Sequence, residues 1–300
     1  MPGSQDFETD PRNETALVWL NGALVPRSEA RVSLFDAGFG MGDGVWEGLR
    51  LHRRRLLFLE AHLDRLLAGA AAIRLDIGLS RVELTSALEA VVAANAMTDG
   101  AHLRLMVTRG VKATINQDPR NALGQPTIAI TAEHKRPTNT QQGLALATVA
   151  VRCTPADMFD MRLNSHSRLN LITALLEAID LGADEALMLD PQGFVSSCNA
   201  TNFFFVSGGE VKTSAGACCF NGITRGHVIE LCRRYGLPLA VGDFSPEAAR
   251  AADEAFVTGT LGGITPVRRL DGVEFAACPG SITSRLAALY EDLKDADAAR

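Results

Sequence analysis

Three short stretches of the chain carry residue types that bind anions. Arg65 lies in His62-Leu63-Asp64-Arg65-Leu66, a pattern typical of a helix that presents one basic side chain. Gly222-Ile223-Thr224-Arg225 places a glycine turn before a helix start, and Thr258-Gly259-Thr260 follows a strand-like run. The N–H groups at a helix start and the helix dipole together favour a phosphate or carboxylate. Singly, these stretches suit a surface arginine, an N-cap at Thr224 and a strand exit, but their order and spacing predict one anion site.

A second group of candidates lies between Asn164 and Arg168. An arginine stays protonated and can hold a carboxylate or phosphate in a forked grip, which makes Arg168 a candidate for substrate binding. A histidine can act as a general base near neutral pH, which gives His166 a candidate catalytic role. The plainer alternatives are a loop histidine bonded to backbone and a first-turn helix arginine that faces solvent.

The bulk properties exclude several classes of function. The chain has 300 residues and a formal net charge of −6, and its basic residues form no long run, so we expect no nucleic-acid partner. No apolar run approaches the roughly 20 residues that span a bilayer, and the polar, acidic start is unlike a signal peptide. The six cysteines lack CxxC spacing and the histidines lack ligand spacing. We therefore expect a cytoplasmic protein with no membrane partner and no metal.

Strand-like and helical patterns alternate along the chain, which predicts mixed α/β structure. The turn Asn21-Gly22 between two apolar runs predicts a hairpin. A polar stretch broken by Pro137 predicts a linker at 137–143. The expected helices cover 57–74, 80–95, 168–181, the run between Thr224 and Gly236, and 282–293, and the expected strands cover 45–51, 102–108, 126–132, 185–189, 202–206 and 255–257. The linker divides a flexible tail (1–15) and a small α/β domain (16–136) from a large domain (144–300).

These motifs, taken together, resemble the class IV pyridoxal-phosphate aminotransferases, which include branched-chain and D-amino-acid aminotransferases and aminodeoxychorismate lyase. The matching stretches follow the family order from about residue 16 to 275. They are Trp19-Leu20-Asn21-Gly22, Gly42-Asp43-Gly44-Val45-Trp46-Glu47, His62 to Leu66, Glu177-Ala178, Gly182 to Leu187, Asn202-Phe203-Phe204, Gly222 to Arg225, and Ala252-Asp253-Glu254 through Thr260 to Thr265-Pro266-Val267.

The resemblance implies the two-domain fold type IV of D-amino-acid aminotransferases, with a small N-terminal α/β domain and a larger barrel-like domain. It implies a small amino or keto acid as substrate and a homodimer or higher homo-oligomer. It places Trp46 where the family has an aromatic residue facing the substrate. It assigns the cofactor site, mainly the phosphate cup, to Arg65, Ser197, Gly222, Ile223, Thr224, Gly259 and Thr260.

Two positions depart from the family pattern. The family's catalytic lysine, which attaches the cofactor and moves the substrate's α-proton, corresponds to Asn164 here. The glutamate that keeps the pyridine nitrogen protonated corresponds to Ser197. An amide is neither nucleophilic nor basic, and a serine hydroxyl cannot hold that proton. We therefore expect pyridoxal or pyridoxamine phosphate to be held without a covalent link, or else another phosphate- or carboxylate-bearing ligand.

Three functional hypotheses stay open on the sequence. The first is an enzyme with altered chemistry in which Asn164, His166 and Arg168 form the catalytic group. The second is a non-catalytic subunit or binding protein on the same scaffold. The third is an ordinary aminotransferase that uses another lysine. The chain has four lysines, Lys112, Lys135, Lys212 and Lys294, of which we expect only Lys112 near the cofactor site.

Overall fold

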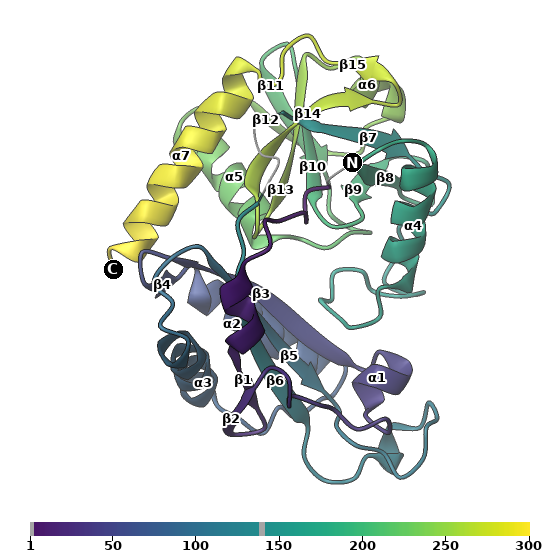
Figure 1. Cartoon of the computed structure of the whole chain (residues 1–300). Coiled ribbons are helices and arrows are strands. Elements are labelled where there is room, and N and C mark those ends of the chain that lie inside the picture. The colour runs from purple at the N-terminus through teal and green to yellow at the C-terminus, as the bar shows by residue number, and fades with distance from the viewer. Residues whose placement is uncertain (1–2, 138–141) are drawn as a thin grey trace. The chain divides into compact units, whose positions relative to one another are not determined.

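The computed structural model describes residues 3–137 and 142–300, which group into two units (Figure 1). The small unit comprises Thr9–Arg136, Leu163–Arg168 and Asp297–Arg300. The large unit comprises the described parts of Met1–Glu8 and Pro137–Arg162, together with Leu169–Ala296. Both units combine helices with a β-sheet, so the predicted mixed α/β class is confirmed.

The small unit is built on a sheet in the order β2-β1-β6-β5-β3-β4 within its described residues. The predicted hairpin is present, because Leu20 pairs with Ala23 across Asn21 and Gly22, which both have positive φ. The longest pairing joins β3 to β5, with Trp46 opposite Met106. The strands are β1 (Leu17–Leu20), β2 (Ala23–Pro26), β3 (Gly44–His52), β4 (Arg55–Leu56), β5 (Ala101–Thr108) and β6 (Thr127–His134).

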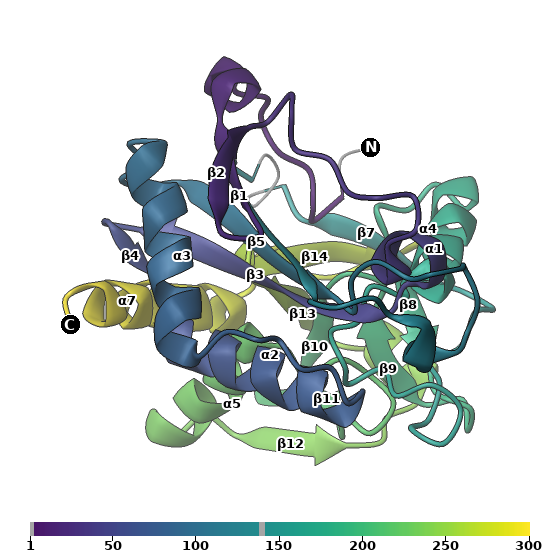
Figure 2. The ribbon, with the colours of Figure 1, turned by 90° about the horizontal axis from the view of Figure 1, so that it is seen from below.

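Two helices cover one face of this sheet, α2 (Leu59–Ala72) and α3 (Arg81–Ala94) (Figure 2). Helix α3 starts in a capping box, in which Ser80 and Glu83 each bond the other's backbone N–H. Buried Leu63 and Leu88 bring the two helices into one apolar core with the sheet. Shorter elements are η1 (Pro11–Thr15), α1 (Ala37–Met41) and η2 (Pro119–Asn121).

The large unit contains a nine-stranded sheet, counted over the described residues, in the order β12-β11-β10-β13-β14-β7-β8-β9 with β15 beside β14. The sheet curls, because β9 at one end returns to β10, where Asn202 Nδ2 lies 3.1 Å from Ser197 Oγ. The predicted barrel-like β structure is therefore confirmed. The strands are β7 (Leu144–Thr148), β8 (Glu185–Leu189), β9 (Val195–Cys198), β10 (Asn202–Ser207), β11 (Glu210–Ser214), β12 (Leu239–Gly242), β13 (Glu254–Gly259), β14 (Gly263–Leu270) and β15 (Val273–Glu274).

Four helices accompany this sheet in the described chain: α4 (Leu169–Asp180), α5 (Ile223–Arg234), α6 (Pro246–Arg250) and α7 (Ser281–Ala298). Helix α4 packs on β7 and β8, and α5 packs on β13 and β12. Stacked rings of Phe204 and Phe256, 4.9 Å apart, join β10 to β13 in the interior. None of the helices described is long and apolar enough to cross a membrane.

The contacts group some segments differently from the domain boundaries expected from the sequence. Leu163–Arg168 groups with the small unit although it follows the expected linker, and residues 3–8 group with the large unit although they precede the small domain. The structural reason is hydrogen bonding: the first segment bonds to β3, and Ser4 bonds to Glu185 on β8. The central part of the expected linker, 138–141, lies outside the described residues.

Candidate functional site

The N-terminus of α5 is the candidate phosphate-binding element of the large unit. Gly222 is its N-cap, and no side chain there bonds back to the first turn. The alternative prediction of Thr224 as the N-cap is therefore wrong: Thr224 is the second helical residue, buried, with Oγ1 3.3 Å from Tyr290 Oη. A helix start without a capping side chain leaves first-turn N–H groups to an outside acceptor.

Asn202 fixes the position of this helix start. Its Oδ1 accepts from the N–H of Gly222 at 3.0 Å, and its Nδ2 donates to the carbonyl of Phe220 at 2.6 Å. A Cβ added to Gly222 would lie 2.6 Å from that Oδ1, so the approach requires glycine. The amide of Asn202 therefore holds the loop and the cap together from β10.

Thr258 adds a hydroxyl on the same face of the sheet. It pairs with Asn202 across the antiparallel strands β13 and β10, and directly opposed residues point to the same side. The Thr258 side chain is buried, and Oγ1 has no hydrogen-bond partner among the described residues. A buried hydroxyl without a hydrogen-bond partner lowers the stability of the fold, and a phosphate oxygen bound there would supply the missing partner. Gly259 and Thr260, the predicted cup residues on this stretch, follow Thr258 and are half-buried.

Arg225 places a buried cation at the same helix start. Its Nη2 donates to the carbonyl of Ser214 at 2.7 Å, and its Nε has no hydrogen-bond partner within the described chain. Burial lowers the pKa of its guanidinium, and the nearby Cys219 opposes that shift. Buried charges are normally paired, so this arginine favours an anion near the first turn of α5. In the sequence Arg225 stands out only as part of the Gly222–Arg225 motif, because its burial depends on long-range packing.

Ser197, at the position that the resemblance gives to a glutamate, is fully engaged. Its hydroxyl donates to the carbonyl of Thr201 at 2.8 Å and accepts from Asn202 Nδ2 at 3.1 Å. The side chain is buried on β9. Ser197 therefore supports Asn202 and does not provide a carboxylate.

Three candidate residues of the small unit, Asn164, His166 and Arg168, lie on Leu163–Arg168, which runs along the start of β3. Trp46 donates its backbone N–H to the carbonyl of Asn164 at 2.9 Å, and His166 donates its own to the carbonyl of Gly44 at 3.0 Å. Gly44 allows this approach, since a Cβ there would lie 2.6 Å from His166 Cδ2 and 2.4 Å from the carbonyl oxygen of Val107. The segment thus acts as a short extra strand beside β3.

Trp46, Asn164 and Arg168 form one contact group. Nε1 of Trp46 donates to the carbonyl of Ser165 at 3.1 Å, which fixes the indole. The guanidinium of Arg168 donates to Oδ1 of Asn164 and lies 5.5 Å from the Trp46 ring centroid. Arg104, from β5, lies 4.1 Å from the same centroid. Burial, followed by the charges of Arg104 and Arg65, lowers the pKa of Arg168 to about 10, so it remains a cation at neutral pH.

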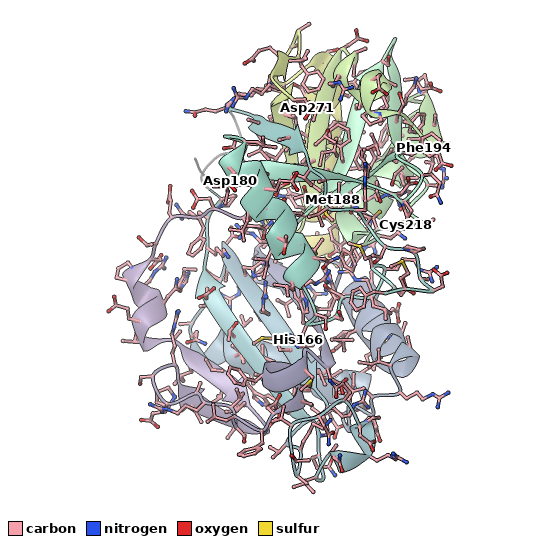
Figure 3. The ribbon with its side chains drawn as sticks, turned by 90° about the vertical axis from the view of Figure 1, so that its right-hand side faces the viewer. His166, Asp180, Met188, Phe194, Cys218 and Asp271 are labelled. Carbon is pink, nitrogen blue, oxygen red and sulfur yellow. The ribbon has the colours of Figure 1, made fainter. Side chains whose placement is uncertain are left out.

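His166, labelled in Figure 3, follows Ser165 on the same segment. Its ring nitrogen Nε2 is buried and has no hydrogen-bond partner within residues 3–137 and 142–300. Burial first, and then the charges of Arg104 and Arg168, lowers the pKa of the ring. The imidazole is therefore neutral near pH 7, as a general base requires.

Arg65 is held by a buried carboxylate in the small unit. Its Nε and Nη2 each lie 2.7 Å from an oxygen of Glu47, and Nδ1 of His62 lies 2.7 Å from the same carboxylate. Burial raises the pKa of Glu47, but the bonds from Arg65 and His62 outweigh it, so the net pKa is lowered and the group is ionised. Arg65 keeps 20% of its side chain exposed, which leaves surface for a ligand.

The four lysines are distributed over both units. Lys112 is buried, and its Nζ donates to the carbonyls of Asn116 and Asp118 at 2.6 and 2.9 Å, within its own loop. Lys135 also lies in the small unit, where burial lowers the pKa of its amine. In the large unit, Lys212 lies 3.4 Å from Glu210, and Lys294 lies 2.6 Å from Glu291. Lys212 and Lys294 therefore belong to a different unit from the segment that carries Asn164.

Comparison with known proteins identifies the family to which the chain belongs. The family model "Amino-transferase class IV" matches residues 44–270, which is most of the chain. The chain belongs to the class IV aminotransferase family. A putative branched-chain-amino-acid aminotransferase of Methanocaldococcus jannaschii is 36% identical over 279 residues, covering 92% of this chain and 96% of that protein.

Other relatives of this class IV chain are longer or have solved structures. Branched-chain-amino-acid aminotransferase-like protein 2 of Arabidopsis thaliana is 37% identical over 95% of the chain, which spans only 51% of that protein. The branched-chain aminotransferase of Thermoproteus uzoniensis, solved with norvaline, has a TM-score of 0.84 and 32% identity, with 93% of this chain and 94% of that chain covered. The branched-chain amino acid aminotransferase of Thermobaculum terrenum, solved in its PLP-form, has a TM-score of 0.83 and 25% identity, with 96% and 95% covered.

The residues of this class IV chain fit one part of a pyridoxal-type coenzyme and not another. The cap at Gly222, the Thr258 hydroxyl without a partner in the described chain and the buried Arg225 form a donor set suited to a phosphate. Asn164 stands at the position that the resemblance gives to the lysine, and its amide oxygen accepts from Arg168. The Ser197 hydroxyl is likewise bonded to a neighbouring group. The donor set of the large unit suits a phosphate, and neither of these two side chains is an amine or a carboxylate.

Proposed function

We propose that this chain binds a phosphorylated ligand of the pyridoxal or pyridoxamine phosphate class without a covalent bond and acts on a small amino or keto acid. The observation that carries the proposal is the contrast between the two candidate sites. In the large unit, the α5 start at Gly222 without a capping side chain, and the Thr258 hydroxyl without a partner among the described residues, support a phosphate-binding site. In the small unit, an amide bound by Arg168 occupies the position that the resemblance gives to the lysine.

The roles of the small-unit residues follow from their contacts. Arg168 is a cation beside the Trp46 indole, which supports binding of a substrate carboxylate. His166 is neutral with Nε2 available, which supports proton transfer to or from the substrate. Asn164 orients Arg168 through its amide oxygen. A bound pyridoxal-type ring would supply the electron sink for this chemistry.

A matched pair of glycine variants tests the phosphate cup. Gly222→Ala would bring a Cβ to 2.6 Å from Asn202 Oδ1, whereas Gly226→Ala, one turn later in α5, meets nothing within 4 Å. We expect pyridoxamine phosphate, titrated by calorimetry, to bind wild type and Gly226→Ala alike and Gly222→Ala at least about tenfold more weakly, since N–H groups bound to a charged oxygen contribute roughly 1.5–3 kcal/mol. No saturable binding to wild type, or equal binding to both variants, contradicts the proposal.

We also propose that the chain forms a homodimer through α4. Along one face of this helix Leu169, Ile172, Leu176 and Ile179 are 75%, 54%, 57% and 55% exposed. This spacing gives a continuous apolar stripe, and such stripes mark association surfaces. We expect Ile172→Glu to yield monomers in light scattering, whereas Glu230→Gln on α5 leaves the assembly unchanged. A wild-type monomer would contradict this surface.

The second candidate function is a non-catalytic subunit on the same scaffold, and the observation that favours it is the same apolar stripe. A partner chain that has the lysine could bind α4 in place of a second copy. Purified alone, such a subunit would bind pyridoxamine phosphate but leave small 2-keto acids unchanged. Conversion of a 2-keto acid to the corresponding amino acid in the presence of stoichiometric pyridoxamine phosphate would support the enzyme and exclude the non-catalytic subunit.

A further inference from the structure

An unbroken series of buried hydrogen bonds links the N-terminal segment of the large unit to the start of α5. Ser4 donates its hydroxyl to Oε1 of Glu185, and the Thr201 hydroxyl donates to Oε2 of Glu185 at 2.7 Å. The carbonyl of Thr201 then accepts from the Ser197 hydroxyl at 2.8 Å. Asn202 continues the series, with Nδ2 on Ser197 Oγ and Oδ1 on the N–H of Gly222.

The members of this series are buried over their whole length. Ser4, Glu185, Thr201, Ser197 and Asn202 are 9%, 2%, 7%, 4% and 4% exposed. In a low-dielectric interior such bonds reinforce one another, and losing one partner leaves the other with the full cost of its burial. Loss of the Ser4 hydroxyl would therefore leave a buried oxygen of Glu185 without that partner and with little access to water.

Burying the Glu185 carboxyl has a high desolvation free energy, which packing alone does not explain. Its carboxyl is held by two hydroxyls, and no ion pair to it is found in the described part of the chain. Burial raises its pKa to about 7, against the lowering effect of the Ser4 and Thr201 hydroxyls. An apolar residue would fill the same volume at lower cost, so we infer a purpose for the carboxyl.

We propose that Glu185 and Ser4 are positioning residues for the anion site, and that docking of residues 3–7 on Glu185 sets the order of the Gly222 cap. The ionised carboxylate accepts from both hydroxyls, which fixes Thr201 and, through it, Ser197 and Asn202. A protonated Glu185 must donate one bond, which reverses the direction of one hydroxyl and loosens the series. The inference rests on the proposed phosphate site, whose affinity it would tune.

Two other titratable groups lie near Glu185. Asp184 lies beside it, with Oδ2 bonded to the N–H of Ala145 at 2.7 Å and 3.6 Å from Nη2 of Arg268 on β14. Cys198 of β9 faces it as well, and burial raises the pKa of that thiol well above its ordinary range, so it stays neutral. Glu185, whose pKa is about 7, changes charge near neutral pH.

Amide hydrogen exchange in the ligand-free protein tests this hydrogen-bond series, here called the relay, independently of any ligand. We expect Ser4→Ala and Glu185→Gln to speed exchange of the Gly222 N–H by about fivefold, which corresponds to roughly 1 kcal/mol for one hydrogen bond. Ser245→Ala removes the N-cap of α6 in the same unit and serves as the control, with no effect at Gly222. After correction for intrinsic exchange, protection at Gly222 relative to the other amides of the large unit should rise in wild type between pH 6 and 8, and in Glu185→Gln this ratio should stay flat.

The outcomes separate the relay from the phosphate site. Exchange at Gly222 in both variants within the range of the Ser245→Ala control overturns the relay, whatever the protein binds. Faster exchange throughout the large unit would reveal a general loss of stability and also overturns it. Neither result depends on pyridoxamine phosphate, whereas failure of wild type to bind that ligand counts against the proposed function alone.

Discussion

The guanidinium of Arg168 donates to the amide oxygen of Asn164, about one helical turn earlier in the chain. The same guanidinium lies 5.5 Å from the ring centroid of Trp46, whose backbone N–H bonds to the carbonyl of Asn164. The amide at the position that the resemblance gives to the lysine therefore contacts a cation beside an indole ring. The residues at 164 and 168 are physically coupled, because a lysine at 164 and the arginine at 168 would repel each other in this contact.

Asn164→Lys should restore covalent attachment of pyridoxal phosphate. The Arg168 cation disfavours the charged form of the new amine, so attachment begins at a pH roughly one unit lower than in the double variant Asn164→Lys/Arg168→Tyr. Visible absorption of the two proteins against pH, followed by borohydride trapping, measures this difference. Attachment at the same pH in both proteins would contradict the coupling.

Arg168→Gln should weaken binding of pyruvate by about tenfold to a hundredfold, since a charged hydrogen-bond partner contributes roughly 1.5–3 kcal/mol. Arg168→Lys keeps the positive charge but loses the two parallel N–H donors of the guanidinium, so it should recover part of the affinity. The control is Arg162→Gln, which removes an exposed arginine that contacts Asp160 two residues earlier in the chain. Calorimetry with the pyridoxamine-phosphate-loaded protein supplies the affinities, and an Arg168→Gln protein that binds pyruvate like wild type would remove Arg168 from the substrate site.

Thr258→Val should have opposite effects on stability and on binding. The substitution removes a buried hydroxyl that has no partner among the described residues, so the free energy of unfolding should rise by about 1 kcal/mol. The same hydroxyl is a proposed phosphate donor, so affinity for inorganic phosphate should fall about fivefold. Denaturant unfolding and phosphate titration give the two numbers. A variant that loses stability and keeps its phosphate affinity shows that the hydroxyl has a structural partner.

Glu185 should make stability fall as the pH rises towards neutrality. Its pKa is about 7 in the folded chain, above the ordinary value of 4.5, so the folded state binds more protons than the unfolded state between these values. Its contribution is present below about pH 4.5 and is lost as the pH rises through about 7, by up to roughly 3 kcal/mol. Unfolding free energies of wild type and Glu185→Gln, compared from pH 5 to 8, isolate this slope. The same slope in Glu185→Gln would assign it to another group, and Glu230→Gln, an exposed carboxylate, is the matched control.

Local signals in the sequence predict most of the helices and strands near the site. Asn21-Gly22 supplies the positive φ values that its hairpin turn needs, and the helix expected over 57–74 is present as α2. Such features depend on residues a few positions apart, so they can be identified without knowledge of the fold. The same reasoning predicts Thr224 as a cap, but Gly222 starts the helix because Asn202 binds its N–H.

The contacts that join distant segments cannot be predicted in this way. Glu47 is buried under His62 and Arg65, and Ser4 reaches Glu185, 181 positions along the chain. Neither pairing leaves a periodic signal, because both depend on how strands and helices pack. Lys112 shows the same limit: the sequence favours it as the alternative amine, whereas its Nζ bonds to two carbonyls of its own loop.

Borohydride reduction of the protein loaded with pyridoxal phosphate, followed by intact-mass and peptide analysis, tests the central claim most directly. With Asn164 at the lysine position, we expect the coenzyme to bind, to leave on dialysis, and to add no mass after reduction. A pyridoxyl group found on Lys112, or on any other lysine of the chain, would contradict non-covalent binding and would show ordinary aminotransferase chemistry.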